Sequence, residues 1–360
     1  MIKRALTYDD IQLVPSYSEI KSRKDISLRT HVTRRYGLVN PIVGSPMDTV
    51  CDSEMAFALY KLGGVGCIHR FMSISEQVVE VTKLKSQIDS TVELEMDFVW
   101  GVMYDDWHTE IRQVPIMAAI GVSDSDLIRA KRLMDAGANI ILIDVAHGHT
   151  KQVLNMIKSL KYFTKTSHQH VDIIAGNIAT AEAAEDLQNA GADGLRVGIG
   201  SGSLCTTRIK TGFGVPSITC LSEIARVAIV PIMADGGIRT SGDITKAIAF
   251  GADCVMLGSL IAGTSQSPGE RILKGSGLFK RYRGSASLET KTTHGQENRN
   301  IEGESTVIPF KGDVEPIIYD LLDGIRSGLS YCGASNISQF NPEYVEITNA
   351  GMIEAKPHLL

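Results

Sequence analysis

The chain has 360 residues, of which 43% are hydrophobic and 21% charged, and its formal net charge is −5. This balance is ordinary for a globular protein, and the length fits either two domains or one α/β barrel with decorations. The slight excess of acidic residues gives no global basic field, so neither nucleic acid nor an anionic membrane is expected as a partner.

The amino-terminal stretch "MIKRALTYDDIQLVPSY" carries charges but no apolar core, so no secretory signal is expected. No uninterrupted apolar run reaches the roughly 20 residues of a membrane span. The six cysteines are scattered without a CxxC pair, which argues against a disulfide framework and against a zinc ribbon. We therefore expect a cytoplasmic protein with reduced thiols.

Eight short apolar runs recur along the chain, and a segment of helical character follows each. The runs cover residues 41–47, 63–69, 115–121, 140–146, 171–177, 193–199, 230–236 and 253–259. Each is apolar on both faces, as expected of a parallel strand covered on both sides. Stretches such as "SDLIRAKRLMDAGA" and "TAEAAEDLQNAGA" are amphipathic and close on a glycine suited to a helix C-cap.

The repeated strand and helix pattern predicts an α/β fold, a (β/α)8 TIM barrel in a single catalytic domain over residues 1–360. A doubly wound open sheet is the alternative. It would need a nucleotide fingerprint after its first strand, and the sequence has none there.

Two segments interrupt this rhythm. Residues 86–114 are acidic, contain both tryptophans and are too short for a domain, so we expect a short decoration after the second β/α unit. Residues 283–306 are polar, with Leu288 and Ile301 as the only large apolar side chains. A long polar loop after the last strand predicts a mobile active-site flap, although a solvated loop without function has the same composition.

Glycines follow the seventh and eighth strands, in "ADGGIR" and "LGSLIAG". In a barrel, the loops at the carboxyl ends of these strands commonly bind phosphate through backbone N–H groups. We expect Gly237, Gly258 and Ser259 to do so, each loop leading into a helix, with Asp235 beside them to accept ribose hydroxyls. The alternative is that the glycines only make turns.

The loop "GIGSGSLCTTRIKTGFG" follows the sixth strand, at residues 198–214. A lone cysteine is commonly a buried, inert residue. Cys205 differs because a polar, glycine-rich loop beside an arginine favours the thiolate form. The carbonyls of Gly200, Gly202 and Cys205 could also converge on a monovalent cation. Asn177, after the fifth strand, is a candidate ligand of a second substrate.

At these motifs the chain resembles the IMP dehydrogenase/GMP reductase family. The likeness runs nearly end to end and includes "GSPMDTV", "GGVGCIHRFMSI", "DVAHGH", "AGNIAT", "LRVGIGSGSLCTTR", "ADGGIRTSGDITKAIAFGAD", "YRGSASLE" and "RSGLSYCGASNI". The resemblance implies a (β/α)8 barrel, usually a homotetramer. It also implies a cysteine that attacks C2 of a purine nucleotide, and hydride transfer with NADPH or NAD.

The resemblance assigns roles residue by residue. It makes Cys205 the nucleophile, and it places the nucleotide against Ser45, Met47, Ser203, Asp235, Gly237, Gly258, Ser259, Tyr282, Ser285 and Ala286. At Ser285 and Ala286 the family usually has Met-Gly. It brings Asp144, Ala146, Asn177 and Arg196 to the cofactor. It gives K⁺ the carbonyls of Gly200, Gly202 and Cys205, with Glu354, Ala355 and Lys356 contributed by a neighbouring subunit.

Two reactions share the covalent intermediate on the cysteine. The dehydrogenase oxidises IMP with NAD and hydrolyses the intermediate to XMP, for which its flap supplies an Arg-Tyr pair. The reductase expels ammonia from GMP and reduces the intermediate to IMP with NADPH. Here eleven residues separate Thr290 from Glu302, with Arg299 but no tyrosine among them. Thr207 and Glu302 match the reductase's proton-relay positions, so the sequence favours GMP reductase, with IMP dehydrogenase as the alternative. The usual dehydrogenase carries a regulatory CBS pair after its second β/α unit. In this chain only the short segment 86–114 occupies that place.

Overall fold

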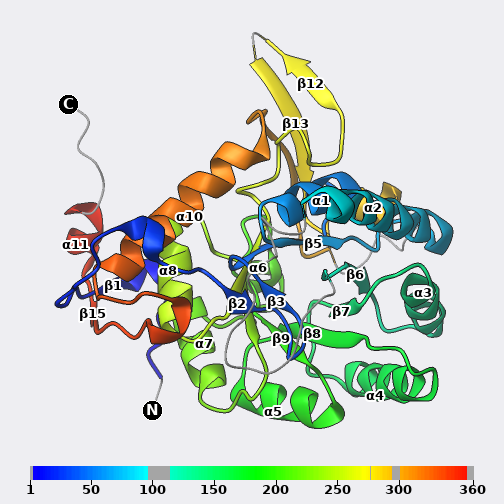
Figure 1. The fold of residues 1–360 in the computed structure, drawn as a ribbon, viewed down its shortest axis with the longest axis horizontal. Helices are drawn as coiled ribbons and strands as arrows, with labels where there is room; N and C mark the ends of the chain where they lie inside the picture. Colours follow the sequence, from blue (N-terminus) through cyan, green and yellow to red (C-terminus); the bar gives the residue numbers. More distant parts are fainter. Residues whose placement is uncertain (1–2, 96–113, 276, 294–300, 355–360) are drawn as a thin grey trace.

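The computed structural model describes residues 3–95, 114–275, 277–293 and 301–354. Eight parallel strands close into a barrel in the order β10-β11-β4-β5-β6-β7-β8-β9 (Figure 1). They are β4 (Ile42–Gly44), β5 (Val65–Ile68), β6 (Met117–Ile120), β7 (Ile140–Asp144), β8 (Asp172–Ile178), β9 (Gly194–Val197), β10 (Ile232–Asp235) and β11 (Cys254–Leu257). Each lies within a predicted apolar run or extends one residue beyond it, so the (β/α)8 barrel is confirmed.

Helices cover the outside of the barrel (Figure 1). They are α1 (Ser53–Lys61), α2 (Ile74–Glu95), α3 (Asp124–Asp135), α4 (Lys151–Thr166), α5 (Ala181–Ala190), α7 (Ser217–Ala225), α8 (Ser241–Ala249) and α10 (Val314–Ser330), with the short α6 (Thr207–Thr211) before α7. The predicted C-cap glycines follow α3 and α5. Gly137 and Gly191 have φ of 111° and 110°, a left-handed conformation that glycine adopts without steric cost.

Two apolar layers hold the barrel together. Isoleucine, leucine and valine side chains fill the space between strands and helices. A separate cluster fills the barrel interior, with Met117, Leu142 and Met233 at 0–1% exposure. The short hairpin β2 (Thr30–His31) and β3 (Gly37–Leu38) adds Leu38 to that interior cluster. The barrel is therefore a packed core whose loops are free to carry chemistry.

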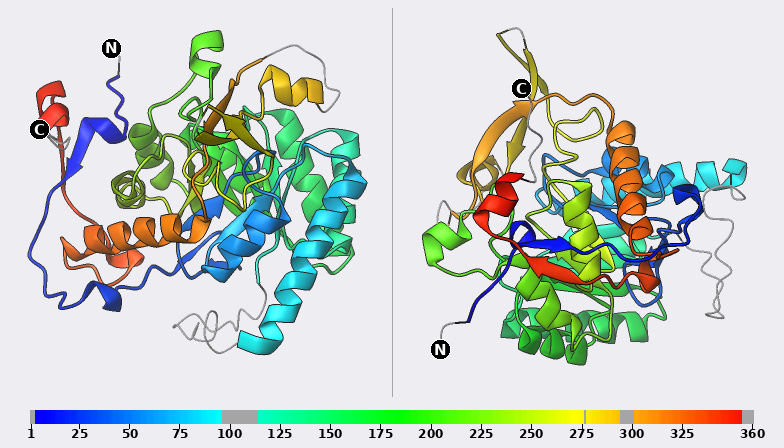
Figure 2. Two further views of the ribbon diagram at one scale, coloured as in Figure 1. Left: turned by 90° about the horizontal axis from the view of Figure 1, so that it is seen from above. Right: turned by 90° about the vertical axis from the view of Figure 1, so that its left-hand side faces the viewer.

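Segments from the two ends of the chain meet on the flank that carries α8 (Figures 1 and 2). Strand β1 (Ile11–Leu13), after a 3₁₀ turn at Tyr8–Asp10, pairs antiparallel with β15 (Tyr344–Glu346). Tyr344 contacts Phe250 edge to face, with ring centroids 4.8 Å apart. Helix α11 (Asn349–Glu354) follows β15.

The eighth β/α unit is interrupted between β11 and α10. A three-stranded antiparallel sheet lies there, formed by β12 (Arg271–Lys274), β13 (Gly277–Arg283) and β14 (Ser305–Pro309), with helix α9 (Leu288–Thr293) between β13 and β14. The hairpin of β12 and β13 extends away from the barrel (Figure 1). We call residues 284–304 the flap.

Three boundaries differ from the sequence predictions. Residues 86–95 continue helix α2, so a decoration can begin only after Glu95, and residues 96–113 lie outside the described residues.

The first part of the predicted flap is helix α9, in which Thr290 is fully buried and donates a hydrogen bond to the Gly284 carbonyl. Residues 294–300 lie outside the described residues, and the mobility of the flap stays a prediction. The loop after β11 makes one turn, with Ala262 N–H bonded to the Gly258 carbonyl, and does not lead into a helix as expected.

Among the described helices, none combines the length and apolar character that crossing a membrane requires.

Candidate active site

A pocket of about 280 Å³ opens where the barrel strands end. Loops after β4, β7, β8, β9, β10 and β11 line it, together with residues of β13 and the flap. Of the predicted site residues, it brings together Ser45, Met47, Asp144, Ala146, Asn177, Arg196, Gly200, Gly202, Ser203, Cys205, Thr207, Asp235, Gly237, Gly258, Ser259, Tyr282, Ser285, Ala286 and Glu302. Glu354 is exposed in α11 and outside this lining, and Ala355 and Lys356 lie outside the described residues.

The loop after β9 folds back to present Cys205. Gly200 has φ of 82°, and a Cβ there would come within 2.7 Å of Arg208 Cγ, so both conformation and space require glycine. The N–H of Cys205 donates to the Gly202 carbonyl at 3.0 Å. These contacts hold the thiol at the pocket wall.

Cys205 differs from the other cysteines in its surroundings. It is half-buried and lines the pocket, whereas four of the others are fully buried, namely Cys51, Cys67, Cys220 and Cys254. Burial raises the pKa of the Cys51, Cys67 and Cys254 thiols well above the ordinary value, and that of Cys220 to about 12. Such thiols stay protonated and inert. Among the pocket-lining residues, Cys205 is the one thiol.

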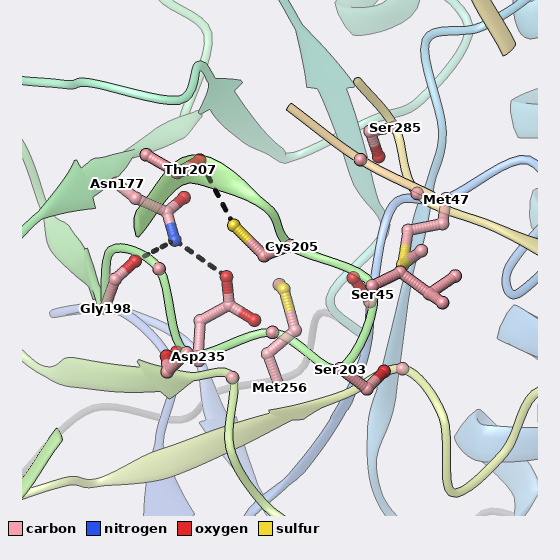
Figure 3. Close-up of a pocket in the computed structure, with 18 of the residues that line it drawn as sticks. Ser45, Met47, Asn177, Gly198, Ser203, Cys205, Thr207, Asp235, Met256 and Ser285 are labelled. Carbon is pink, nitrogen blue, oxygen red and sulfur yellow. Dashed lines mark hydrogen bonds between the residues drawn. The ribbon is translucent and has the colours of Figure 1, made fainter. Parts of the chain in front are cut away.

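Two hydrogen bonds connect Cys205 to the flap. Its Sγ lies 3.2 Å from Thr207 Oγ1, and the Thr207 hydroxyl donates to Glu302 Oε2 at 2.7 Å. Figure 3 shows the first of these contacts facing the pocket. Backbone bonds hold Glu302 in place, since its carbonyl accepts from Thr206 N–H at 3.0 Å and its N–H donates to the Ala286 carbonyl at 3.2 Å. A thiol, a hydroxyl and a carboxylate therefore form a continuous path for a proton.

A second network lies at the carboxyl ends of β7, β8, β9 and β10. Asn177 Nδ2 donates to Asp235 Oδ2 and to the Gly198 carbonyl, both at 2.7 Å (Figure 3). Arg196 forms ion pairs with both neighbouring carboxylates, from Nη2 to Asp235 Oδ2 at 2.9 Å and from Nη1 to Asp144 Oδ1 at 2.5 Å. Burial alone would lower the pKa of Arg196, but the charges of Asp235 and Asp144 raise it. The arginine is thus a fixed cation that orients both carboxylates.

Hydroxyl groups and close-packed backbone gather near the ends of β10 and β11. Ser203 Oγ and the Tyr282 hydroxyl are 3.0 Å apart. Burial raises the pKa of Tyr282, against the opposing effect of hydrogen bonds with Ser203 and Ser259. A Cβ at Gly258 would lie 3.3 Å from that hydroxyl. Neutral hydroxyl donors beside a glycine backbone at this place suit a phosphate group.

Two residues of the floor network escaped the sequence analysis. Arg70 Nε approaches Asp144 Oδ2 at 3.4 Å, and Ser201 Oγ donates to the Asp235 carbonyl at 3.1 Å. Arg70 lies two residues after the end of β5, so its position near a strand end was an available signal. Ser201 lies inside the cysteine loop, where nothing in the sequence sets it apart from its neighbours.

The fold and this pocket define a class, a (β/α)8-barrel enzyme with a nucleotide-sized pocket and a loop thiol. The profile of the "IMP dehydrogenase / GMP reductase domain" matches residues 5–358. An inosine-5′-monophosphate dehydrogenase of Cryptosporidium parvum is 40% identical over 390 residues, covering 99% of this chain and 96% of that protein. A GMP reductase of Leishmania donovani is 33% identical over 480 residues, with 99% and 97% covered.

The solved structures agree. The crystal structure of a GMP reductase variant from Trypanosoma brucei, in complex with guanosine 5′-monophosphate, superposes with a TM-score of 0.89 at 32% identity. The match covers 100% of this chain and 98% of that one. The chain belongs to the IMP dehydrogenase/GMP reductase family, oxidoreductases that act on purine nucleotides with a nicotinamide cofactor.

Proposed function

We propose that the protein is a GMP reductase, which converts GMP and NADPH to IMP, ammonia and NADP. The observation that carries the proposal is the hydrogen-bonded path from Cys205 through Thr207 to Glu302, with contacts of 3.2 and 2.7 Å. This path suits proton delivery to a leaving amine. Hydrolysis would instead need a group that activates water.

In the first half-reaction, Cys205 Sγ bonds to C2 of GMP, and its proton moves through Thr207 toward Glu302. The same path returns a proton to the 2-amino group. The C2–N bond then breaks, ammonia leaves, and the purine stays attached to Cys205 as a thioimidate. In this proposal Asp235, which Asn177 and Arg196 contact, accepts the ribose hydroxyls, and Ser203, Tyr282, Gly237, Gly258 and Ser259 hold the phosphate. Ser45, Met47, Ser285 and Ala286 line the remaining wall of the nucleotide pocket.

In the second half-reaction, a reduced nicotinamide held by Asp144, Ala146, Asn177 and Arg196 would supply the hydride that C2 accepts. The C2–S bond breaks as the hydride adds, IMP is released, and the Cys205 thiolate regains its proton. The donor set fits a nicotinamide nucleotide, because Ala146 offers an apolar surface beside the amide of Asn177 and the Asp144–Arg196 pair. These residues orient the ring and keep water from the thioimidate.

IMP dehydrogenase is the second candidate, favoured by the 40% identity to the Cryptosporidium enzyme. Its hydrolytic step needs an activated water. The eleven residues between Thr290 and Glu302 contain Arg299 but no tyrosine. Without such a pair the thioimidate persists long enough to be reduced, so we favour the reductase.

A monovalent cation and a homotetramer belong to the same proposal. The Gly202 carbonyl accepts the N–H of Cys205 and retains a second acceptor position, so it fits a K⁺ ligand together with the carbonyls of Gly200 and Cys205. Carbonyls of Glu354, Ala355 and Lys356 from a neighbouring subunit would complete the set. Light scattering tests the tetramer, and the GMP reduction rate in K⁺ against Li⁺ buffer tests the cation.

The deciding experiment follows nicotinamide absorbance with purified protein in two mixtures, GMP with NADPH and IMP with NAD. We expect absorbance to fall in the first, with IMP and ammonia formed in equal amounts. Sustained absorbance gain in the second, with XMP released, would establish the dehydrogenase and overturn the proposal. A gain limited to one turnover per Cys205 supports the reductase, because hydride transfer then occurs without hydrolysis.

A further inference from the structure

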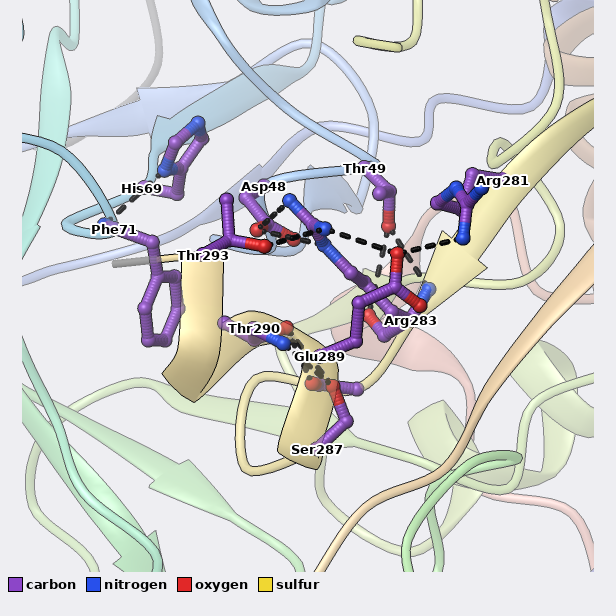
Figure 4. A network of polar contacts seen from close by, with 11 residues as sticks. Asp48, Thr49, His69, Phe71, Arg281, Arg283, Ser287, Glu289, Thr290 and Thr293 are labelled. Carbon is purple, nitrogen blue, oxygen red and sulfur yellow. Dashed lines mark hydrogen bonds and ion pairs between the residues drawn. The ribbon is translucent and has the colours of Figure 1, made fainter. Parts of the chain in front are cut away.

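A cluster of charged and hydroxyl side chains joins helix α9 of the flap to β13 and to the loop after β4, outside the pocket lining (Figure 4). Arg283, the last residue of β13, is its centre. Its guanidinium contacts Asp48 Oδ2 twice, from Nε at 2.9 Å and from Nη2 at 2.7 Å. The side chains are 13% and 3% exposed, so this ion pair is shielded from solvent. Asp48 follows Met47 of the nucleotide pocket, so Arg283 holds the loop after β4.

The same guanidinium reaches helix α9. Arg283 Nη1 lies 3.3 Å from both Glu289 Oε1 and Thr293 Oγ1, and Arg281 Nη1 lies 2.7 Å from that glutamate oxygen. Thr293 is the last residue of α9. The first part of the flap is thus tied to β13 by two side chains one helical turn apart.

The segment that leaves the flap is tied to the same group. Ser305 begins β14, pairs with Arg283 in the strand ladder, and hydrogen-bonds to the Glu289 carboxylate. Ser305 is three residues after Glu302. Glu289 therefore links the entry and the exit of the flap at one point. We call Asp48, Arg281, Arg283, Glu289, Thr293 and Ser305 the flap clasp.

The charges of the flap clasp balance. Burial raises the pKa of Glu289, but the Ser305 hydrogen bond and the charges of Arg281 and Arg283 together lower it. Burial alone would lower the pKa of Arg283, whereas the hydrogen bond and charge of Asp48 raise it. Two cations thus face two carboxylates, and removing one member leaves a partly buried charge without its partner.

We propose that Arg283 and Glu289 are positioning residues that set the place of Glu302 against Thr207 and Cys205. The inference rests on the proposed function, because it gives Glu302 the proton transfer to the leaving amine. Glu302 is joined to the catalytic loop by backbone bonds on one side, and the flap clasp fixes the two ends of its segment on the other. A loosened flap clasp leaves the nucleotide pocket formed but lets the carboxylate drift from the hydroxyl.

The test compares Glu289→Gln with two other variants. Thr293→Val removes a single contact of the flap clasp, and Asp323→Asn is the matched control because its carboxylate forms an exposed ion pair with Arg326 at 3.3 Å on α10. For each, kcat of GMP reduction, Kd of GMP and Tm are measured. A misplacement of about 1 Å costs roughly 10²-fold in rate. We expect Glu289→Gln to lower kcat 10- to 100-fold, with less than threefold change in Kd, a smaller loss in Thr293→Val and none in Asp323→Asn.

A second readout separates positioning from general damage. Hydride transfer from IMP to NADP, the reverse of the second half-reaction, forms the thioimidate without any ammonia step. Its single-turnover rate should stay within threefold of wild type in Glu289→Gln. Equal losses of GMP reduction and of IMP oxidation would overturn the proposal, as would an unchanged kcat in a Glu289→Gln protein of unchanged Tm.

The two proposals fail in different ways. A wild-type protein that leaves GMP and NADPH unreacted overturns the proposed function. The flap clasp is then judged by trypsin, which cuts after Lys291 and Arg299 of the flap segment. Faster cleavage there in Glu289→Gln than in wild type and Asp323→Asn supports the flap clasp, and equal rates contradict it.

Discussion

The mouth of the barrel and the flap contribute to the same pocket in different ways. Asp235, Asn177 and Arg196 lie in barrel strands and contact one another through partly buried hydrogen bonds. Glu302 reaches the pocket from an insertion between β11 and α10, and Arg283 of that insertion contacts Asp48 in the loop after β4. The barrel binds a purine nucleotide in either member of the family. In the proposed mechanism the flap supplies Glu302, and the cysteine loop supplies Cys205 and Thr207, so both regions contribute to the reaction of the covalent intermediate.

The largest expected effect falls on the barrel side. Replacing Cys205 with alanine removes the nucleophile and should lower kcat by about 10³-fold or more. Nucleotide binding should persist, because the phosphate and ribose contacts are made elsewhere. Steady-state kinetics and calorimetric titration with GMP measure the two quantities. A loss of binding as large as the loss of rate would remove Cys205 from the nucleophile's role.

Glu302→Gln is the corresponding change in the flap. It keeps the shape of the side chain but prevents proton transfer, for which general acid–base help is worth about 10²–10⁴-fold. We expect GMP reduction to slow by about 10²-fold while GMP affinity changes little. Ammonia release in a single turnover measures the step directly. An unaffected rate would mean that the flap only covers the pocket.

Tyr282→Phe tests the contact between the two regions, since β13 brings this hydroxyl to Ser203 of the cysteine loop. Losing one hydrogen bond of this kind costs about 0.5–1.5 kcal/mol, which corresponds to a rise of about 2- to 12-fold in KM for GMP. The value of kcat should stay nearly constant. A fall in kcat with unchanged KM would place Tyr282 in the chemical step.

The smallest effect on activity is expected at the far end of the barrel. Burial raises the pKa of Asp253 from 3.8 to about 6, and its carboxylate accepts the Ile232 N–H at 2.7 Å. The folded state therefore holds this proton more tightly than the unfolded state, and stability falls as pH rises from about 4 through 6. Asp253→Asn keeps the acceptor without the charge. The Tm of the variant should exceed that of wild type by a margin that grows over this range, and parallel Tm curves would contradict it.

The parts of the molecule that the sequence could predict are those whose signal is local. Eight runs apolar on both faces became eight strands because a parallel strand in a barrel is buried on both sides. Residues that follow these strands then had to meet at one end, which is why Cys205, Asn177 and Asp235 line one pocket.

Other parts were missed for identifiable reasons. The acidic character of residues 86–95 suggested a separate segment, yet Val81, Leu84 and Ile88 keep a helical spacing and are buried, so the helix continues. The flap clasp was beyond prediction, because Arg283 and Asp48 are 235 positions apart and a single sequence gives no sign of such a pairing. The loop after β11 does not lead directly into a helix because β12, β13, α9 and β14 are inserted there. The eighth barrel helix is therefore α10, which follows this insertion.

The pairing of β1 with β15 has a consequence for how the molecule is made. Residues 11–13 leave the ribosome some 330 residues before residues 344–346, with which they pair. Every barrel strand is available once residue 257 has left the ribosome, but β1 has no partner until some ninety residues later. The barrel can close during translation, whereas the pairing of β1 with β15 on its flank forms later. A contact between residues so far apart in sequence is of the kind that slows folding. A chain stalled before residue 344 would therefore lack the partner strand of β1, which carries the buried side chain Ile11.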